Sequence, residues 1–282
     1  MHAATSGNLE GRQAREAYSL SLLVPKRSLG QNFVIDPNTS RKIAWLGELH
    51  PGDKVLEIGP GLGALTGALV DAGAFVTAVE IDRRLVERLR PIEHSGRVRI
   101  VEGDILRISF DEILGQDRWK MVSNLPYNIA TPTVMRILED APQVESMVVM
   151  VQREVARRWT ARPGSSTYGA VTVRMSYFAT SQLLGAVSRN VFVPRPRVES
   201  SLVQIKRLPE VAVDPTVAGY ASMVELIHAS YQHRRKMLRH SLAGWCSQEA
   251  FLHAGVSPES RPQELSIIEW GRLAAAIRSG DS

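Results

Sequence analysis

The sequence predicts an α/β protein with a mostly parallel sheet, followed by a small helical domain. Short apolar segments alternate with helical patterns between residues 54 and 152, a glycine-rich turn follows the first of them, and helical spacing prevails after residue 208. Such alternation is typical of a parallel sheet covered by helices on both faces. The chain has 282 residues, 44% of them hydrophobic, which is enough for one large or two unequal domains.

The elements follow in order along the chain. Asp36 and Pro37 predict an N-cap and first helical residue, for a helix that runs to about Leu49. Two prolines within Phe192–Arg197 predict a stiff, irregular loop. The remaining predicted strands are Lys54–Ile58, Phe75–Ile81, Val98–Glu102, Trp119–Ser123, Met147–Gln152, Gln182–Val187 and Ser201–Ile205, and the remaining predicted helices are Leu62–Ala72, Arg83–Arg90, Glu154–Trp159, Met223–Leu242, Gln248–Ala254 and Ile267–Ile277.

Three regions are predicted from these patterns. Residues 1–25 show no clear periodicity and are expected to form a flexible N-terminal tail. Residues 26–208 would form the α/β domain, and residues 209–282 the helical domain.

Composition limits the possible classes of protein. A charged fraction of 22% is that of a folded chain, and a single cysteine excludes an internal disulfide and fits a reducing compartment. No apolar run approaches the roughly 20 residues that span a bilayer. The seven histidines show no metal-ligand spacing. We expect a monomeric, cytoplasmic protein with no metal and no membrane contact.

The net charge of +5 is unevenly distributed. Residues 1–150 contain 17 Lys/Arg and 19 Asp/Glu, residues 151–207 contain 10 and 2, and residues 208–282 contain 7 and 8. The basic surplus therefore lies in the middle segment. It indicates a surface for a polyanion or a solvated face of arginines, and charge alone does not decide between them.

A glycine loop follows the first predicted strand, in Glu57–Gly63. Gly59 and Gly61 would let the backbone approach a ligand closely. Glu80 ends the second strand, where a carboxylate can accept hydrogen bonds from both ribose hydroxyls. Because Gly59, Gly61 and Ala64 also satisfy the dinucleotide fingerprint, a nicotinamide-dependent oxidoreductase and a purely structural turn remain open at this point.

Polar residues also follow the third and fourth strands. Asp104 could hold the exocyclic amino group of an adenine or simply cap a helix, and Asn124-Leu125-Pro126-Tyr127 comes one strand later. The carboxyl ends of parallel strands lie at one edge, where such sheets bind ligands. A hydride-transfer site has no evident need for this tetrad.

The tetrad has the groups needed to activate an amino nitrogen attached to an aromatic base. The Asn124 side-chain oxygen and a backbone carbonyl can accept both amino hydrogens, which favours the tetrahedral nitrogen that forms during attack. Pro126 would fix the backbone so that a carbonyl points into the site, and Tyr127 offers a face for stacking. A turn motif without function is the alternative.

These motifs resemble a known family. The tetrad resembles motif IV of amino-group methyltransferases, and Leu29–Phe33 (LGQNF) resembles the GQNF signature of the KsgA-type ribosomal RNA adenine dimethyltransferases. Glu57–Gly63 is similar to their EIGPGxG motif, Phe192–Val203 (FVPRPRVESSLV) to FxPxPKVDSxVV, and Tyr231–Leu242 (YQHRRKMLRHSL) to FxxRRKTLRNSL. The matches run in the family's order from residue 26 to about residue 242, and as a set they are highly specific.

The resemblance implies a Rossmann-like class I methyltransferase fold with seven strands, the last antiparallel, and a small helical C-terminal domain. It implies that the donor S-adenosylmethionine contacts Asn32, Val34, Gly59, Glu80, Asp104 and Asn124, with Val34 in place of the family's usual leucine. The glycine loop argument adds Gly61 to the donor site. It further implies that Asn124, Pro126 and Tyr127 act on the adenine, with Phe192 closing the stack from the other side.

The implied reaction is the transfer of two methyl groups to N6 of each of two adjacent adenosines near the 3′ end of small-subunit (16S) ribosomal RNA, with a role in small-subunit biogenesis. The expected partner is ribosomal RNA in a small-subunit precursor. The alternatives are the related large-subunit (23S) dimethyltransferase that confers macrolide resistance, and an RNA-binding assembly factor whose catalysis is secondary.

An adenine in structured RNA must be flipped out to reach such a pocket, so contacts with the RNA backbone must offset the cost of unstacking. Cationic side chains in clusters are the candidates, although any single arginine is as easily explained as solvated. The candidate RNA-binding residues are Arg153, Arg157, Arg158, Arg195, Arg197, Arg234, Arg235, Lys236 and Arg239.

Overall fold

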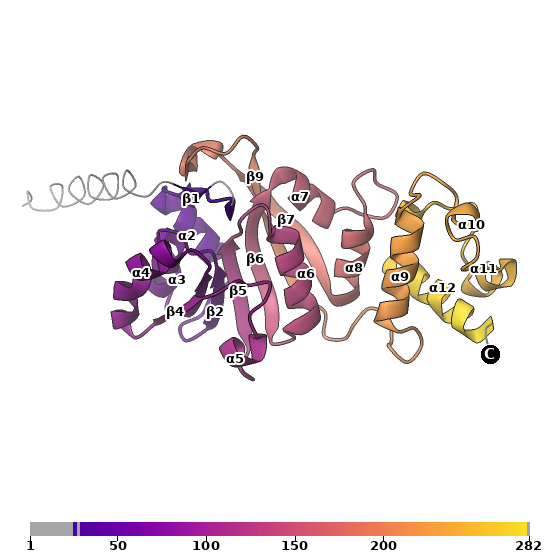
Figure 1. The fold of residues 1–282 in the computed structure, drawn as a ribbon, viewed down its shortest axis with the longest axis horizontal. Helices are drawn as coiled ribbons and strands as arrows, with labels where there is room; N and C mark the ends of the chain where they lie inside the picture. The colour runs from indigo at the N-terminus through magenta and orange to yellow at the C-terminus, as the bar shows by residue number, and fades with distance from the viewer. Residues whose placement is uncertain (1–24, 27–28, 281–282) are drawn as a thin grey trace, which may run out of the picture.

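The computed structural model describes residues 25–26 and 29–280, and its central feature is a seven-stranded sheet (Figure 1). The strand order is β4-β3-β2-β5-β6-β9-β7. The strands are β2 (Lys54–Ile58), β3 (Phe75–Glu80), β4 (Val98–Glu102), β5 (Trp119–Asn124), β6 (Val144–Gln152), β7 (Ala179–Val187) and β9 (Ser200–Arg207). Neighbours from β4 to β6 pair in parallel, whereas β9 runs antiparallel to β6 and β7. The expected fold is confirmed, including the antiparallel last strand.

Helices cover both faces of this sheet, because successive strand residues point to opposite sides. Val55 belongs to one hydrophobic cluster and Leu56 to the other, and both are fully buried. The helices of the Val55 face are α2 (Pro37–Leu46), α3 (Ala64–Asp71) and α4 (Arg83–Leu89), followed by the 3₁₀ helix η2 (Arg90–Ser95). Those of the Leu56 face are α5 (Phe110–Leu114), α6 (Ala130–Asp140), α7 (Arg153–Trp159) and α8 (Ala170–Phe178).

The C-terminal helices pack at the β7 end of the sheet, far from α3 and α4 (Figure 1). They are α9 (Tyr220–Tyr231), α10 (Leu238–Ser241), α11 (Gln248–Ala254), the 3₁₀ helix η4 (Pro262–Glu264) and α12 (Ile267–Gly280). Their core surrounds the fully buried Trp270 and includes Tyr168, Val173 and Tyr177 from before residue 208. The division at residues 208 and 209 stays a prediction, and helical packing across it joins the two regions.

The predicted single helix Met223–Leu242 is wrong. Helix α9 ends at Tyr231, residues 232–237 form a turn, and the short α10 follows. The amides of Leu238 and Arg239 donate to the carbonyls of Ser260 and Pro258, at 2.8 and 2.9 Å. These tertiary bonds replace the intrahelical bonds that a continuous helix would make.

The predicted irregular loop Phe192–Arg197 is wrong for its first two residues. Phe192–Val193 forms strand β8, which pairs antiparallel with β1 (Phe33–Val34) and follows the 3₁₀ helix η3 (Arg189–Val191). Both residues precede the first proline, so their amides remain free to pair.

Two further expectations concern the ends and the environment of the chain. The predicted N-terminal tail, residues 1–25, lies outside the described residues except for residue 25. Within the part that the structure describes, no helix is both long and apolar enough to cross a membrane.

Candidate active site

A pocket opens at the carboxyl ends of β2, β3 and β5, beside the β4–α5 turn, with a volume of about 220 Å³. Residues 29–34, which precede α2 in the chain, also line the pocket and are here called the strap. The pocket brings together most of the residues predicted to contact donor or adenine: Asn32, Val34, Gly59, Gly61, Glu80, Asp104, Asn124, Pro126 and Tyr127. Phe192 is not among the lining residues.

The glycine loop packs closely against the strap and the tetrad, at positions where a side chain would be strained. Gly59 and Gly61 have φ of 67° and 60°, a region that side chains with a Cβ rarely adopt. A Cβ at Gly61 would lie 2.8 Å from the Phe33 ring, and one at Gly59 would lie 3.2 Å from Pro126. Glycine at these two positions therefore allows the loop to line the pocket while it packs against Phe33 and Pro126.

Two carboxylates follow neighbouring strands. Glu80 is 5% exposed, and its Oε1 accepts the Asp82 amide at 2.9 Å. Burial raises the pKa of Glu80 above its ordinary value, although hydrogen bonds from backbone amides act to lower it. Asp104 Oδ1 accepts the Leu106 amide at 3.0 Å, so Asp104 does stabilise a local turn while it also lines the pocket.

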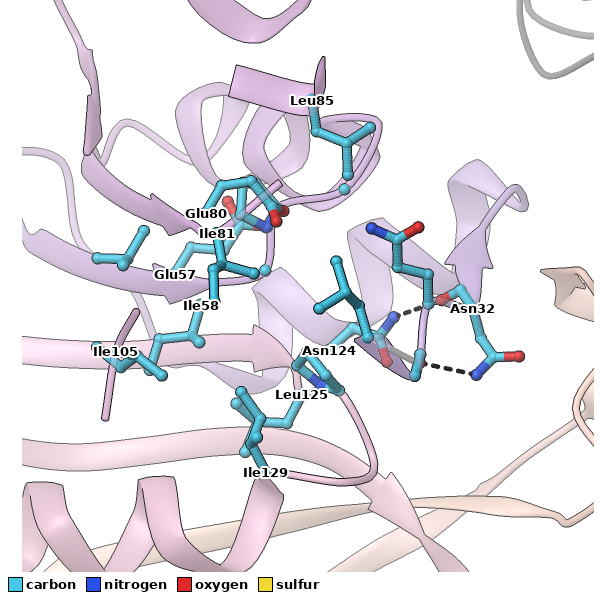
Figure 2. A pocket seen from close by; sticks show the side chains of 18 of the residues that line it. Asn32, Glu57, Ile58, Glu80, Ile81, Leu85, Ile105, Asn124, Leu125 and Ile129 are labelled. Atoms are coloured by element: carbon cyan, nitrogen blue, oxygen red, sulfur yellow. Dashed lines mark hydrogen bonds between the residues drawn. The ribbon is translucent and has the colours of Figure 1, made fainter. Parts of the chain in front are cut away.

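Asn124 is oriented by the strap. Its Nδ2 donates to the main-chain carbonyl of Asn32 at 3.0 Å. Asn32 in turn donates from its own side chain to the Gly30 carbonyl at 3.1 Å. Figure 2 shows both bonds, with Glu57 and Glu80 on the other side of the view. Because the bond to Asn32 uses the amide nitrogen of Asn124, the side-chain oxygen remains available as an acceptor.

The other tetrad residues are held by local and distant contacts. The Pro126 carbonyl accepts the Ile129 amide at 3.1 Å, which closes a tight turn. The hydroxyl of Tyr127 lies 2.6 Å from the Ser200 Oγ, and Ser200 is fully buried at the start of β9. Burial raises the pKa of Tyr127, so the phenol stays neutral.

Phe192 lies in the cluster beneath α2 and α3, where it is 2% exposed and pairs with Val34. Its stacking role stays a prediction, and in this conformation that role requires β8 to shift.

Sequence reasoning missed one residue that lines the pocket and two that support residues around it. Glu57 is 1% exposed, accepts a hydrogen bond from the Thr66 hydroxyl at 2.6 Å, and has a pKa raised by burial to about 8. Its position in the quoted glycine motif was the available signal. Ser200 and Asp82 act through contacts with distant residues, which no local pattern indicates.

The predicted RNA-binding cations occupy three surfaces. Arg153 is paired with Glu199, and Arg158 with Glu154 at 3.0 Å. Arg195 and Arg197 are exposed after β8. In the turn 232–237, Arg235 and Lys236 are exposed, and Arg234 donates to the Ser166 carbonyl at 3.0 Å. Arg239, which belongs to α10, lies 3.5 Å from Glu259. Arg157, on α7, is also exposed.

A seven-stranded sheet of this order, with an acid at the end of β3 and an Asn-Leu-Pro-Tyr turn that begins at the end of β5, defines a Rossmann-like class I methyltransferase. A family model described as "Ribosomal RNA adenine dimethylase" matches residues 24–278. The chain belongs to the ribosomal RNA adenine dimethylase family, and it is an enzyme of that family.

Known proteins similar to this chain agree with that assignment. The "Ribosomal RNA small subunit methyltransferase A" of Thermobifida fusca is 41% identical over 261 residues, covering 89% of each chain. The protein of the same name from Acidothermus cellulolyticus is 42% identical over 265 residues. Among solved structures, the 23S rRNA methyltransferase ErmE has a TM-score of 0.69 at 27% identity, covering 87% of this chain and 99% of its own. A dimethyladenosine transferase from Plasmodium falciparum, at 22% identity and a TM-score of 0.72, shares the fold.

In residues 25–26 and 29–280, no three His, Cys, Asp or Glu side chains gather closely enough to hold an ion.

Proposed function

We propose that the protein methylates N6 of two adjacent adenosines near the 3′ end of small-subunit ribosomal RNA, using S-adenosylmethionine, and gives dimethyladenosine. The observation that carries this proposal is the position of Asn124. It ends β5 in the same pocket as Glu80 and Asp104, and among the described residues no group donates to its side-chain oxygen, which can therefore accept an amino hydrogen.

The residues of the pocket fit such a donor. The buried carboxylate of Glu80 can accept two ribose hydroxyls, and Asp104 can accept an adenine amino group. Gly59 and Gly61 of the glycine loop line the same pocket beside them. When bound, the donor supplies an electrophilic methyl group on a sulfonium, so the protein needs no metal to activate it.

The remaining residues act on the acceptor base. The Asn124 oxygen and a backbone carbonyl of the turn would accept both hydrogens of the adenine amino group, and so draw its lone pair out of conjugation with the ring. Tyr127 would hold the base by stacking. The methylated nitrogen becomes acidic only after attack, so no general base is required beforehand. Positioning and electrostatic stabilisation supply the rate.

The choice of RNA rests on the relatives. Those named as acting on the small subunit are 41% and 42% identical to this chain. The structural likeness to a 23S rRNA methyltransferase at 27% identity favours the large subunit as the second candidate. We place the protein in the cytoplasm as a monomer that acts on a precursor of the small subunit and contributes to its biogenesis.

Incubation with labelled S-adenosylmethionine and separated ribosomal subunits tests the proposal. We expect label in small-subunit RNA, and label confined to the large subunit would instead support the second candidate. Calorimetry with S-adenosylmethionine and with NAD tests which of the two the pocket binds. Binding of NAD alone would show that the glycine loop forms a dinucleotide site.

A further inference from the structure

The strap, residues 29–34, crosses the pocket between two loops and is attached to both. On one side, the Asn32 carbonyl accepts the Asn124 amide. On the other side, Gln31 Nε2 donates to Asp82 Oδ2 at 3.1 Å, and Lys26 Nζ lies 3.3 Å from Asp82 Oδ1. The Lys26 amide also donates to Gln31 Oε1 at 2.7 Å, which turns the Gln31 side chain toward Asp82.

Asp82 is able to release the strap without being left as an unpaired buried charge. Its side chain is 1% exposed and accepts two further bonds from the Arg84 guanidinium, at 3.1 and 2.7 Å. Arg84, and after it Gln31 and Lys26, hold the pKa of Asp82 well below its ordinary value, so the carboxylate is ionised. Because Arg84 belongs to α4 and remains in place when the strap moves, opening breaks contacts but leaves the charge compensated.

Asp82 is also joined to the residue proposed to hold the donor. Its amide donates to Glu80 Oε1 at 2.9 Å. The strap and the ribose-binding carboxylate are therefore linked through one residue. Because the strap lines the same pocket as the glycine loop and Glu80, its attachment at Asp82 affects how widely the pocket opens.

We propose that Asp82, Gln31 and Lys26 form a latch that sets how fast the strap opens for donor entry and for release of the spent donor. The inference rests on the proposed function, since it takes the ligand to be S-adenosylmethionine. Each methyl transfer uses one donor, so repeated transfer to one adenosine requires repeated opening. The three side chains are positioning residues, and none of them touches the reacting atoms.

Release of labelled S-adenosylmethionine, chased with an excess of unlabelled donor, tests the latch in the full-length protein. Gln31→Met keeps the side-chain length and removes the amide, and we expect release to accelerate about tenfold, the effect of losing one hydrogen bond to a charged group. Lys26→Met should accelerate release less, because the Lys26 side chain is 47% exposed and solvent screens its ion pair with Asp82. Arg83→Met is the matched control, since Arg83 pairs with Glu87 on α4 and lies beside the latch without contributing to it.

The latch also predicts a separation of two rates. At saturating donor, the single-turnover methylation rate of Gln31→Met should stay within about twofold of wild type, while release accelerates. Release from Gln31→Met at the wild-type rate would overturn the latch, and so would an equal loss in the single-turnover rate. If wild-type protein retains no labelled donor at all, it is the proposed function that fails.

Discussion

At the residue scale, the hydroxyl of Tyr127 is held 2.6 Å from that of Ser200, which is fully buried. We expect Ser200→Ala to lower the methylation rate about three- to tenfold, the value of one neutral hydrogen bond, because the ring loses its fixed orientation. Tyr127→Phe should lower it equally, and the double variant no further. Tyr127→Ala should be worse, since it also removes the stacking surface.

Single-turnover rates on bound RNA, with donor affinity as the control, measure these effects. Additive losses in the double variant would show that the two hydroxyls act independently.

The second prediction at this scale concerns the stability of the fold. The pKa of Glu57 is raised by burial from 4.5 to about 8. Between these values, the folded state holds a proton that the unfolded state has released. The free energy of unfolding should therefore fall as pH rises from about 5 to 8, by at most about 1.4 kcal/mol per pH unit from this group.

Glu57→Gln removes this titration but can still accept the Thr66 hydroxyl, so its stability should change less with pH. Denaturant unfolding without donor, from pH 5 to pH 8, compares the two proteins. Parallel curves for wild type and Glu57→Gln would mean that Glu57 is ionised in the folded state.

Site residues at the ends of strands could be predicted from the sequence more readily than the residues that hold the site residues in place. Glu80, Asp104 and Asn124 follow from strand periodicity, because parallel strands place their carboxyl ends at one edge. Ser200 contacts Tyr127 across 73 residues of chain. A contact of that kind depends on how β9 inserts between β6 and β7, which no local pattern specifies.

At the element scale, β2 and β4 have the predicted bounds, since apolar runs between turn residues define them sharply. Helix α6 was not predicted, although Pro132 lies in its first turn, where proline is tolerated. The division between α9 and α10 was also missed, because bonds from the α10 amides to residues 258 and 260 override helical spacing.

The segment after β8 carries the prediction for RNA binding. Arg195 and Arg197 are exposed on the chain that leads away from Phe192. Each phosphate contact adds about 0.7–0.9 to the slope of log affinity against log salt. Arg195→Gln with Arg197→Gln should therefore flatten the slope for RNA by about 1.4–1.8, with donor affinity unchanged.

The control is Arg118→Gln, an 87% exposed arginine just before the amino end of the central strand β5. Filter binding over a range of salt concentrations measures the slopes. If the double variant keeps the wild-type slope, these arginines are a solvated surface.

At the scale of the whole molecule, the helical region is fastened to the α/β region by charged and aromatic contacts. Glu139 on α6 accepts hydrogen bonds from Arg174 on α8 and Tyr220 on α9, at 2.5 and 2.6 Å. Because the turn 232–237 follows α9, these contacts connect it to the region that contains the catalytic sheet. The pocket itself would serve any exposed adenine, so the choice of RNA must come from surfaces outside it.

We predict that Arg235→Glu with Lys236→Glu leaves donor affinity intact and abolishes methylation of small ribosomal subunits. These side chains are exposed in a turn, rather than within the helix that the sequence predicted. Their cationic groups would dock on RNA phosphates. Arg261→Glu with Arg272→Glu makes the same change in charge elsewhere on the helical region. Methylation at the normal rate by the turn variant would place recognition on another surface.

The central claim is that this pocket methylates adenosine N6, and the most direct measurement identifies the product. Small-subunit RNA is treated with S-adenosylmethionine and either wild-type or Asn124→Ala protein. Its nucleosides are then separated and identified by mass spectrometry. We predict N6-dimethyladenosine with the wild-type protein, and formation about 10²–10³ times slower with Asn124→Ala, the cost of losing one preorganised polar contact. Equal rates for the two proteins, or a methylated nucleoside other than adenosine, would contradict the account.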